Sequence, residues 1–369
     1  MKRAADIIVI LLLAAVAAAN VLYVQCIRRY AVAAEEMTAQ PADTVMHARL
    51  VFAGDLMAHT PMLTAARRMA AKIADSAGFD FRPMFRHVAE RFRRADYAVV
   101  NLETTLSRGH YSGYPCFRSP IQLAEAMADM GIDAAVTANN HCCDGGALGI
   151  ATTVEVLDSL GIAHTGTFAD SVDYKLNNPH YFKCRGISFA LFSYTYGTNG
   201  LPVPKGRIVN LTDSVAMARD LLSAPTDSVD VRIVFIHWGN EYERRENPHQ
   251  RMLSGFLHRH GADIVIGSHP HVIQPFEADS TSVTIYSLGN FISNQQWRYS
   301  DGGLIATIDV EKRADSHPTY KATLEPVWVM RPDYTVIPVE TGDTIQMPES
   351  LRRRYIEFLD DTRSLLGCE

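Results

Sequence analysis

The sequence has little of what marks several large classes of protein. Its six cysteines in 369 residues show no spacing of a disulfide framework. Charged residues make up only 21% of the chain, the net charge is −6, and no arginine-rich or aromatic-interleaved stretch is present. Nucleic acid is therefore not an expected partner. No internal repeat and no glycine-rich phosphate loop occur, so nucleotide-driven ligation by this chain is not expected.

What the chain does contain is a hydrophobic fraction of 47%, which is enough to bury a full core. Short apolar runs rich in Val, Ile or Phe, typical of buried strands, alternate with amphipathic patterns typical of helices, and this alternation predicts an α/β domain. After residue 271 the pattern changes to short strands with turns, which predicts a second, mainly antiparallel sheet. The expected helices cover residues 61–77, 85–94, 121–131, 147–161, 211–223 and 248–261.

The N-terminal segment is a second strong signal. Lys2 and Arg3 precede an apolar run over residues 7–26. A bilayer core about 30 Å thick needs roughly 20 apolar residues as a helix, whereas a cleaved signal has an apolar region of about 7–15. We therefore expect a single-pass anchor in the cell membrane with an extracytoplasmic domain. Alanine-rich cleavage sites nearby keep a secreted form open as the alternative.

This reading divides the chain into four parts. Residues 1–30 are the expected membrane anchor or signal segment, and residues 31–46, which are small, polar and acidic, are a flexible linker. A folded domain is expected over residues 47–335. Residues 336–369 form a C-terminal extension that ends in a helix, which either packs on the domain or frames a surface for a partner.

Polar side chains follow five of the predicted strands at the point where each strand ends. They lie in the segments FAGDLMAH, VVNLET, TANNH, FIHWG and GSHPH. Because ligands of open α/β sheets bind outside the carboxyl ends of the strands, we expect these clusters to converge on one site. The candidate ligands are Asp55, His59, Glu103, Asn140, His237, His269 and His271.

Each candidate has an ordinary structural explanation when taken alone. Asp55 with His59 fits a solvated loop or a helix N-cap, and Glu103 fits a charge at a helix N-terminus. Asn140 fits a turn closed by its side chain, and His237 fits a core histidine. These separate explanations do not account for the position of all of them at strand ends. The combination of oxygen and imidazole ligands therefore predicts two divalent metal ions, of Mn, Fe or Zn.

The segment His269-Pro270-His271 is the strongest single feature of this set. In an extended loop, residues two apart point to the same side, and the proline restricts the loop. Both imidazoles can therefore face one cluster.

The order of the motifs FAGDLMAH, VVNLET, FRSP, TANNH, HWGNEY, GSHPHVIQP and YSLGNF resembles the poly-γ-glutamate capsule-biosynthesis (CapA/PgsA-type) proteins over residues 50–291. That family is similar to the calcineurin-like metallophosphoesterases. The resemblance implies a two-sheet β-sandwich flanked by helices (αββα), with a two-metal site at the strand ends, here preceded by one N-terminal transmembrane or signal helix.

The resemblance also implies roles for individual residues. Glu103 would bridge the two metals, and His141 would be the catalytic acid. Two departures from the phosphoesterase pattern concern Asp55 and His59, which are four apart where the pattern has Asp-X-His, and Glu103, which stands for an aspartate. The remaining ligands would be Asp55, His59 and His271 at one metal, and Asn140, His237 and His269 at the other.

Three further residues in shared motifs are candidates for binding substrate: Arg118, Glu241 and Asn290. The guanidinium of Arg118 suits a carboxylate or a phosphate, and pairing with a nearby acid is an equally good explanation. For Asn290 a role in a backbone turn is the simpler reading.

The function that the resemblance implies is capsule biosynthesis, by metal-dependent hydrolysis or transfer on an anionic envelope polymer such as poly-γ-glutamate or on a phosphorylated precursor. One alternative is a non-catalytic subunit that binds polymer or assembles a synthase complex in the membrane. Another is a secreted metallophosphatase of broad specificity.

Overall fold

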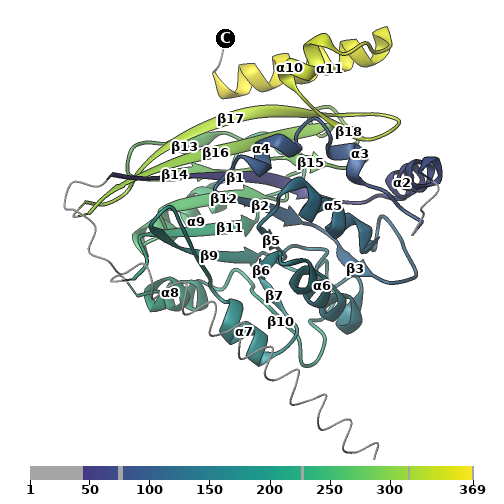
Figure 1. Ribbon diagram of the computed structural model, residues 1–369. Coiled ribbons are helices and arrows are strands. Elements are labelled where there is room, and N and C mark those ends of the chain that lie inside the picture. The colour runs from purple at the N-terminus through teal and green to yellow at the C-terminus, as the bar shows by residue number, and fades with distance from the viewer. Residues whose placement is uncertain (1–44, 74–77, 226–227, 315, 368–369) are drawn as a thin grey trace, which may run out of the picture. The chain divides into compact units, whose positions relative to one another are not determined.

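We describe the protein from a computed structural model, which covers residues 45–73, 78–225, 228–314 and 316–367 (Figure 1). The expected anchor or signal segment over residues 1–30 and nearly all of the linker expected over residues 31–46 lie outside the described residues. The first described strand begins at Val45.

The expectation of a single-pass membrane protein needs correction. Among the residues that the structure describes, no helix combines the length and the apolar character needed to cross a membrane. The apolar run that motivated the expectation falls outside those residues. A long apolar run in a sequence reports hydrophobicity alone, whereas the described helices that cover the sheets each bury an apolar stripe against them.

The first sheet has eight strands. Four of them run parallel in the order β1, β2, β5 and β6, and β15 pairs in parallel with the end of β1. On the other side of β1, the strands β16, β17 and β18 continue the sheet in antiparallel fashion. Their bounds are β1 Val45–Leu56, β2 Tyr97–Leu102, β5 Ala134–Val136, β6 Ala163–Thr165, β15 Asn290–Ile292, β16 Gly302–Arg313, β17 Thr319–Met330 and β18 Thr335–Pro338.

The second sheet has six strands in the order β13-β14-β12-β11-β9-β8. Its central strands β9, β11, β12 and β14 are parallel, and antiparallel strands form the two edges. Two small two-stranded sheets pair β3 with β4 and β7 with β10. The bounds are β8 His180–Cys184, β9 Ile187–Thr195, β11 Val231–His237, β12 Ile264–Ser268, β13 Phe276–Ala278, β14 Val283–Ile285, β3 Thr105–Ser107, β4 Arg118–Pro120, β7 Thr167–Phe168 and β10 Ile208–Val209.

The predicted α/β class is confirmed, because both sheets contain parallel strands connected through helices. The expectation that the strands after residue 271 form a sheet of their own is wrong. β13 and β14 join the second sheet, whereas β15 to β18 extend the first. Alternation of side chains shows that a segment is a strand, but it does not show which strand it pairs with.

The two sheets share a hydrophobic core. Leu50 and Phe52 of β1 face it from the first sheet, and Ile233 and Phe235 of β11 face it from the second. Because side chains alternate along a strand, Val51 and its equivalents on the opposite face of the first sheet pack against the helices that cover that face. These helices are α2 Thr60–Lys72, α3 Arg82–Phe85, α4 Ala89–Arg93, α5 Gln122–Met130 and α6 Gly146–Leu160.

Two helices, α8 Ser214–Ser223 and α9 Pro248–Arg259, cover the outer face of the second sheet. The order of layers is therefore helix, sheet, sheet, helix. The six predicted helices are present as α2, α4, α5, α6, α8 and α9, with ends that differ by a few residues. Helix α7 (Ser171–Asn177) was not predicted, and the reason is that it buries no residue and so has no apolar periodicity.

The C-terminal helices are α10 (Val339–Thr344) and α11 (Glu349–Leu366), and α11 lies along β17 (Figure 1). Tyr355 and Phe358 of α11 join the core between the sheets, and the Tyr355 ring meets that of Trp328 edge to face at 5.8 Å. The expected terminal helix is thus present and packs on the folded part of the chain.

Candidate metal centre

The candidate ligands meet at the ends of strands from both sheets. Asp55 lies near the end of β1, and Glu103 directly follows β2. His237 ends β11, and His269 and His271 follow β12. All five side chains are buried. Strand-end clusters that lie far apart in the sequence therefore form one site, as the sequence predicted.

Glu103 lies at the centre of this cluster. Its Oε1 atom is 3.5 Å from His237 Nε2 and 3.8 Å from His271 Nε2. Both of its carboxylate oxygens are buried, and neither has a hydrogen-bond partner among the described residues. A buried carboxylate without donors is costly unless a cation balances it.

The possible ligand atoms fall into two groups that share Glu103. One group joins Glu103 with His269 and His271, and the other joins Glu103 with Asp55 and His237, with all the ligand atoms of a group within 4.8 Å of one another. The Nδ1 atom of His269 is also buried without a hydrogen-bond partner. The residues present therefore fit a pair of divalent cations with a shared carboxylate.

Hydrogen bonds hold Asp55 in place. Its Oδ1 accepts from Asn101 Nδ2 at 2.8 Å, and its Oδ2 is 3.0 Å from His271 Nδ1. Burial alone would raise the pKa of Asp55, but the hydrogen bond and charge of His271, together with the charge of His237, lower it below its ordinary value. Asp55 is therefore ionised beside its imidazole partner.

Burial and nearby charges also shift the pKa values of the other titratable groups in the cluster. Burial and repulsion by Asp55 raise the pKa of Glu103 well above its usual range. Burial lowers the pKa of His237 to about 3. His271 is the exception, because the charge of Glu103 and the hydrogen bond with Asp55 outweigh its burial and raise its pKa to about 9. Without a bound cation, protons on these side chains must balance the negative charge of the carboxylates.

His237 is held from both ring nitrogens. Its Nε2 is 2.9 Å from Asn140 Oδ1, and its Nδ1 is 2.9 Å from Ser268 Oγ. Asn140 thus lies on the cluster, as predicted. Ser268 and Asn101 orient ligands and were not singled out from the sequence, although both lie inside the motifs GSHPH and VVNLET that were.

His59 lies apart from both groups. Its Nδ1 accepts a hydrogen bond from Asn294 N at 3.2 Å, and its ring packs edge to face on Phe117. Burial lowers its pKa to about 3, and the nearby charges of His271 and His141 add to the effect. The resemblance placed His59 with Asp55 and His271 at one metal. Asp55 and His271 are in contact at 3.0 Å, whereas His59 belongs to neither group of ligand atoms. The division of the ligands between two metals stays a prediction.

His141 is held in a fixed orientation beside the cluster. Its Nδ1 is 2.8 Å from Asp144 Oδ2, and that carboxylate oxygen also accepts from the backbone N–H of Phe117. The Phe117 ring meets the His141 ring edge to face at 4.6 Å. Arg118 donates from Nε and Nη2 to the carbonyl oxygen of Asp144 at 3.3 and 3.2 Å. The FRSP motif therefore supports the loop that carries His141.

Asn290 lies beneath the cluster and Glu241 at its exposed rim. Asn290 Nδ2 donates to the backbone oxygens of His271 and Ser300, so it fixes the loop after β12. Glu241 is exposed, and its charge acts on His237 and His271. A role of Asn290, Glu241 or Arg118 in binding substrate stays a prediction.

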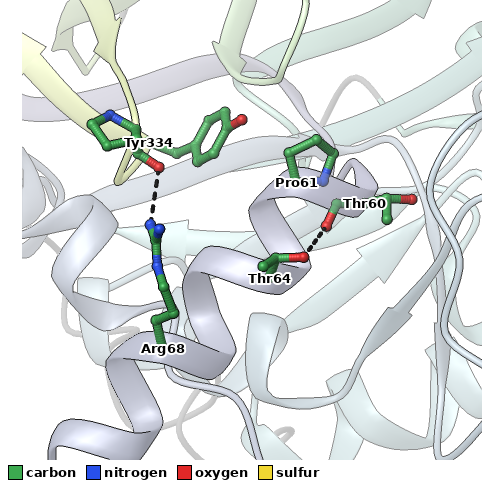
Figure 2. Close-up of a pocket in the computed structure, with 6 residues that line it drawn as sticks. Thr60, Pro61, Thr64, Arg68 and Tyr334 are labelled. Atoms are coloured by element: carbon green, nitrogen blue, oxygen red, sulfur yellow. Dashed lines mark hydrogen bonds between the residues drawn. The ribbon is translucent and has the colours of Figure 1, made fainter.

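A surface pocket of about 410 Å³ lies at the start of α2, next in sequence to His59 (Figure 2). Its polar groups are largely engaged within the protein, since Thr64 Oγ1 donates to the Thr60 carbonyl and Arg68 donates to the Pro332 carbonyl. None of the cluster residues lines it. The pocket is therefore distinct from the candidate metal centre.

A family model and two known sequences that match this chain all belong to capsule synthesis proteins. The model of the family described as bacterial capsule synthesis protein PGA_cap matches residues 49–295. The PGA biosynthesis protein CapA of Bacillus subtilis (strain 168) is 29% identical over 264 residues, which cover 69% of this chain and 66% of that protein. The capsule biosynthesis protein CapA of Bacillus anthracis is 28% identical over 250 residues, which cover 64% of this chain and 60% of that protein. The matches thus span slightly less than two thirds of these relatives.

Among solved structures, a phosphatase from Mycoplasma pneumoniae aligns with a TM-score of 0.48 at 13% identity, covering 79% of this chain and 97% of that chain. A likeness of this size adds no argument to the geometry described above.

Proposed function

The chain belongs to the family of bacterial capsule synthesis proteins (PGA_cap), and from that membership we propose that it acts on an anionic capsule polymer, poly-γ-glutamate or a related chain, or on its phosphorylated precursor. The reaction proposed is metal-dependent hydrolysis or transfer at the cluster around Glu103. We also propose that its two packed sheets are of the metallophosphoesterase type, because the ligands lie at strand ends.

One observation carries this proposal. Glu103 has two buried carboxylate oxygens without hydrogen-bond donors, and it belongs to both groups of ligand atoms. A structural carboxylate would be expected to accept hydrogen bonds from nearby N–H groups, as Asp55 does from Asn101. A bridging metal ligand requires free oxygens.

The residues that would hold the metals are those of the two groups, with Asn140 as an added oxygen ligand at His237. Bound divalent ions would supply electrostatic stabilisation of charge that develops on substrate oxygens. Ser268 and Asn101 keep His237 and Asp55 in the orientation that binding requires.

His141 would supply the proton for the leaving group. Its Nδ1–H donates to Asp144, which leaves Nε2 as the atom that exchanges a proton with substrate. Phe117 covers one side of the imidazole and restricts its rotation. Asp144 is a positioning residue in this scheme, since it acts through His141.

A non-catalytic role in binding or assembling polymer is the second candidate. The position of His59 favours it, because this histidine is outside both ligand groups and accepts a backbone hydrogen bond from Asn294. A site with one ligand fewer than the phosphoesterase pattern could keep metal and bind anions without turnover.

Elemental analysis of the full chain tests the proposal. We expect about two divalent ions per chain in the wild type and a clear loss in Glu103→Gln and His269→Ala. The matched control is His249→Ala on the exposed side of α9, which should keep the metals. A folded wild-type protein without metal would overturn the proposal.

Hydrolysis assays with Mn and Zn then separate the candidates. Turnover of polymer or of a phosphorylated precursor supports the first candidate, and metal without turnover supports the second. Fast cleavage of simple phosphomonoesters, with polymer ignored, would point to a phosphatase of broad specificity.

A further inference from the structure

Two tyrosines and a glutamate form an exposed rim beside the metal cluster. Tyr196 directly follows β9, and Glu241 and Tyr242 lie in the loop after β11. Tyr196 is 45% exposed and Tyr242 is 41% exposed, whereas the histidines that their rings contact are buried. We call Tyr196, Glu241 and Tyr242 the tyrosine rim.

The rings are fixed by the cluster itself. The Tyr196 ring lies 4.5 Å from the His269 ring and 6.3 Å from the His237 ring, nearly parallel to the latter. The Tyr242 ring lies 6.2 Å from that of His271. Each tyrosine therefore has one side on the metal ligands while part of its ring faces solvent.

The backbone holds both tyrosines at these positions. Tyr196 N donates to the His237 carbonyl at 3.0 Å, and Tyr242 N donates to the Pro270 carbonyl at 2.8 Å. Tyr242 has a φ of 65°, a conformation that is rare for a bulky residue. These bonds tie the rim to the same loops that carry the ligands.

Glu241 directly precedes Tyr242 in the chain and is exposed, so it places a negative charge on the rim. Its carboxylate acts on Tyr196 and Tyr242, and on His237 and His271 below. Across the described ranges of the chain, Glu241 forms no ion pair with a lysine or an arginine. An exposed carboxylate on the same rim as two aromatic rings attracts a cation through its charge, and the negative faces of the rings add to that attraction.

We propose that the tyrosine rim binds an ammonium group of the substrate, the amino end of an otherwise anionic γ-glutamyl chain. The inference rests on the proposed function, since it names the part of the polymer that approaches the cluster. Along such a chain every free carboxylate is repelled by Glu241, and the terminal amine is the one group of opposite charge. The rim would therefore direct the end of the chain, and not its middle, to the metal centre.

Binding of two short peptides to the full chain tests this inference. The probes are γ-linked triglutamate with a free amine and the same peptide with an acetylated amine, and binding is measured by calorimetry. We expect the acetylated peptide to bind the wild type about tenfold more weakly, since the charge-assisted contacts are lost.

Variants of the rim should reproduce this loss for the free peptide. Glu241→Gln should weaken its binding about tenfold, and Tyr196→Leu or Tyr242→Leu by roughly two- to thirtyfold each. Tyr196→Phe and Tyr242→Phe, which keep the rings, are the matched controls and should bind within about twofold of the wild type. In Glu241→Gln the preference for the free amine should become smaller, because only the rings remain to attract the ammonium group.

Two results would overturn the inference. One is equal binding of both peptides to the wild type. The other is loss of metal from Glu241→Gln in elemental analysis, which would make Glu241 a ligand. Failure of the proposed function looks different, because a protein without metal or turnover can still prefer the free amine over the acetylated one.

Discussion

At the scale of single residues, the buried carboxylate of Glu103 is expected to lower the stability of the metal-free protein. Glu103 is buried with unpartnered oxygens, and its neighbours are buried histidines and a second carboxylate. Such a group lowers the stability of the metal-free protein, since its charge has lost water without gaining donors. A cation bound between its oxygens and the neighbouring imidazoles would remove this cost.

Replacing Glu103 with Gln should change stability in opposite directions with and without metal. In EDTA the variant should be more stable than the wild type by about 1 kcal/mol, because Glu103 must either hold a buried charge or take up a proton on folding, and glutamine does neither. With Mn or Zn at about 100 times the Kd, the wild type should gain about 2.7 kcal/mol and the variant much less. Urea unfolding in both buffers measures the difference. Equal destabilisation in both would contradict a metal role, and His249→Ala should shift neither.

Asp144 orients His141 through a 2.8 Å contact with Nδ1. Asp144→Asn should lower turnover by about 10²- to 10⁴-fold, because the amide no longer fixes the ring and its proton, while metal content stays unchanged. Kinetics and elemental analysis of the same preparation measure both. Asp144→Glu, which keeps the carboxylate, should recover part of the activity, and a variant that loses its metals would instead assign Asp144 to metal binding.

At the scale of elements, one pattern of paired hydrogen bonds occurs at the start of parallel strands in both sheets. An aspartate directly before each of four strands accepts a hydrogen bond from a backbone N–H of the neighbouring strand at 2.7–2.8 Å, and its own N–H donates to the carbonyl of that same residue. Register set at the start of a strand also sets where the strand ends. The four aspartates are Asp96, Asp133, Asp230 and Asp263.

The contribution of Asp263 to this pattern can be tested through the pH dependence of stability. Burial raises the pKa of its carboxyl, and the hydrogen bond from Arg232 N opposes the rise. Because the folded-state pKa is the higher one, the folded protein binds the proton more tightly. That stabilisation is complete below the ordinary value of 3.8 and is lost as pH rises through the folded pKa.

Asp263→Asn keeps an oxygen that can accept the hydrogen bond, but its amide group does not bind or release a proton in this pH range. Relative to the wild type, its free energy of unfolding should therefore increase as pH rises from about 4 to 7. Urea unfolding across this range measures the trend, and a flat difference would contradict it. Asp263→Ala, which has no acceptor, should be destabilised by about 1–3 kcal/mol at every pH.

At the scale of the whole molecule, the C-terminal helix completes the core between the sheets. Phe358 is 3% exposed and packs where Gly302 leaves room, since a Cβ on that glycine would lie 2.6 Å from the Phe358 ring. Arg354 and Arg298 add ion pairs to Asp301 and Asp361 around the same contact. Residues expected to form a C-terminal extension are thus part of the packed structure.

Phe358→Ala should lower the free energy of unfolding by about 3–5 kcal/mol, because a large side chain leaves a cavity in the core. Ile356→Ala on the same helix, where the side chain is 47% exposed, should change it by no more than about 0.5 kcal/mol. Urea unfolding of both variants measures the contrast. Equal effects would show that α11 is not packed as described.

The sequence by itself determined the α/β class, most of the helices and the position of the candidate ligands at strand ends. These features depend on local periodicity and on where an apolar run stops, and both can be read from neighbouring residues. Asp55, Glu103, His237 and the two histidines of GSHPH were found in this way.

The tertiary structure decided which of these side chains contact one another. Asp55 contacts His271, and Glu103 belongs to both groups of ligand atoms, because the packing of two sheets brings the ends of β1, β2, β11 and β12 together. It also decided that Arg118 supports Asp144 and that the last strands extend the first sheet. Such pairings join segments far apart in the chain, and no local pattern specifies them, because contacts across a core depend on the packing of all its layers.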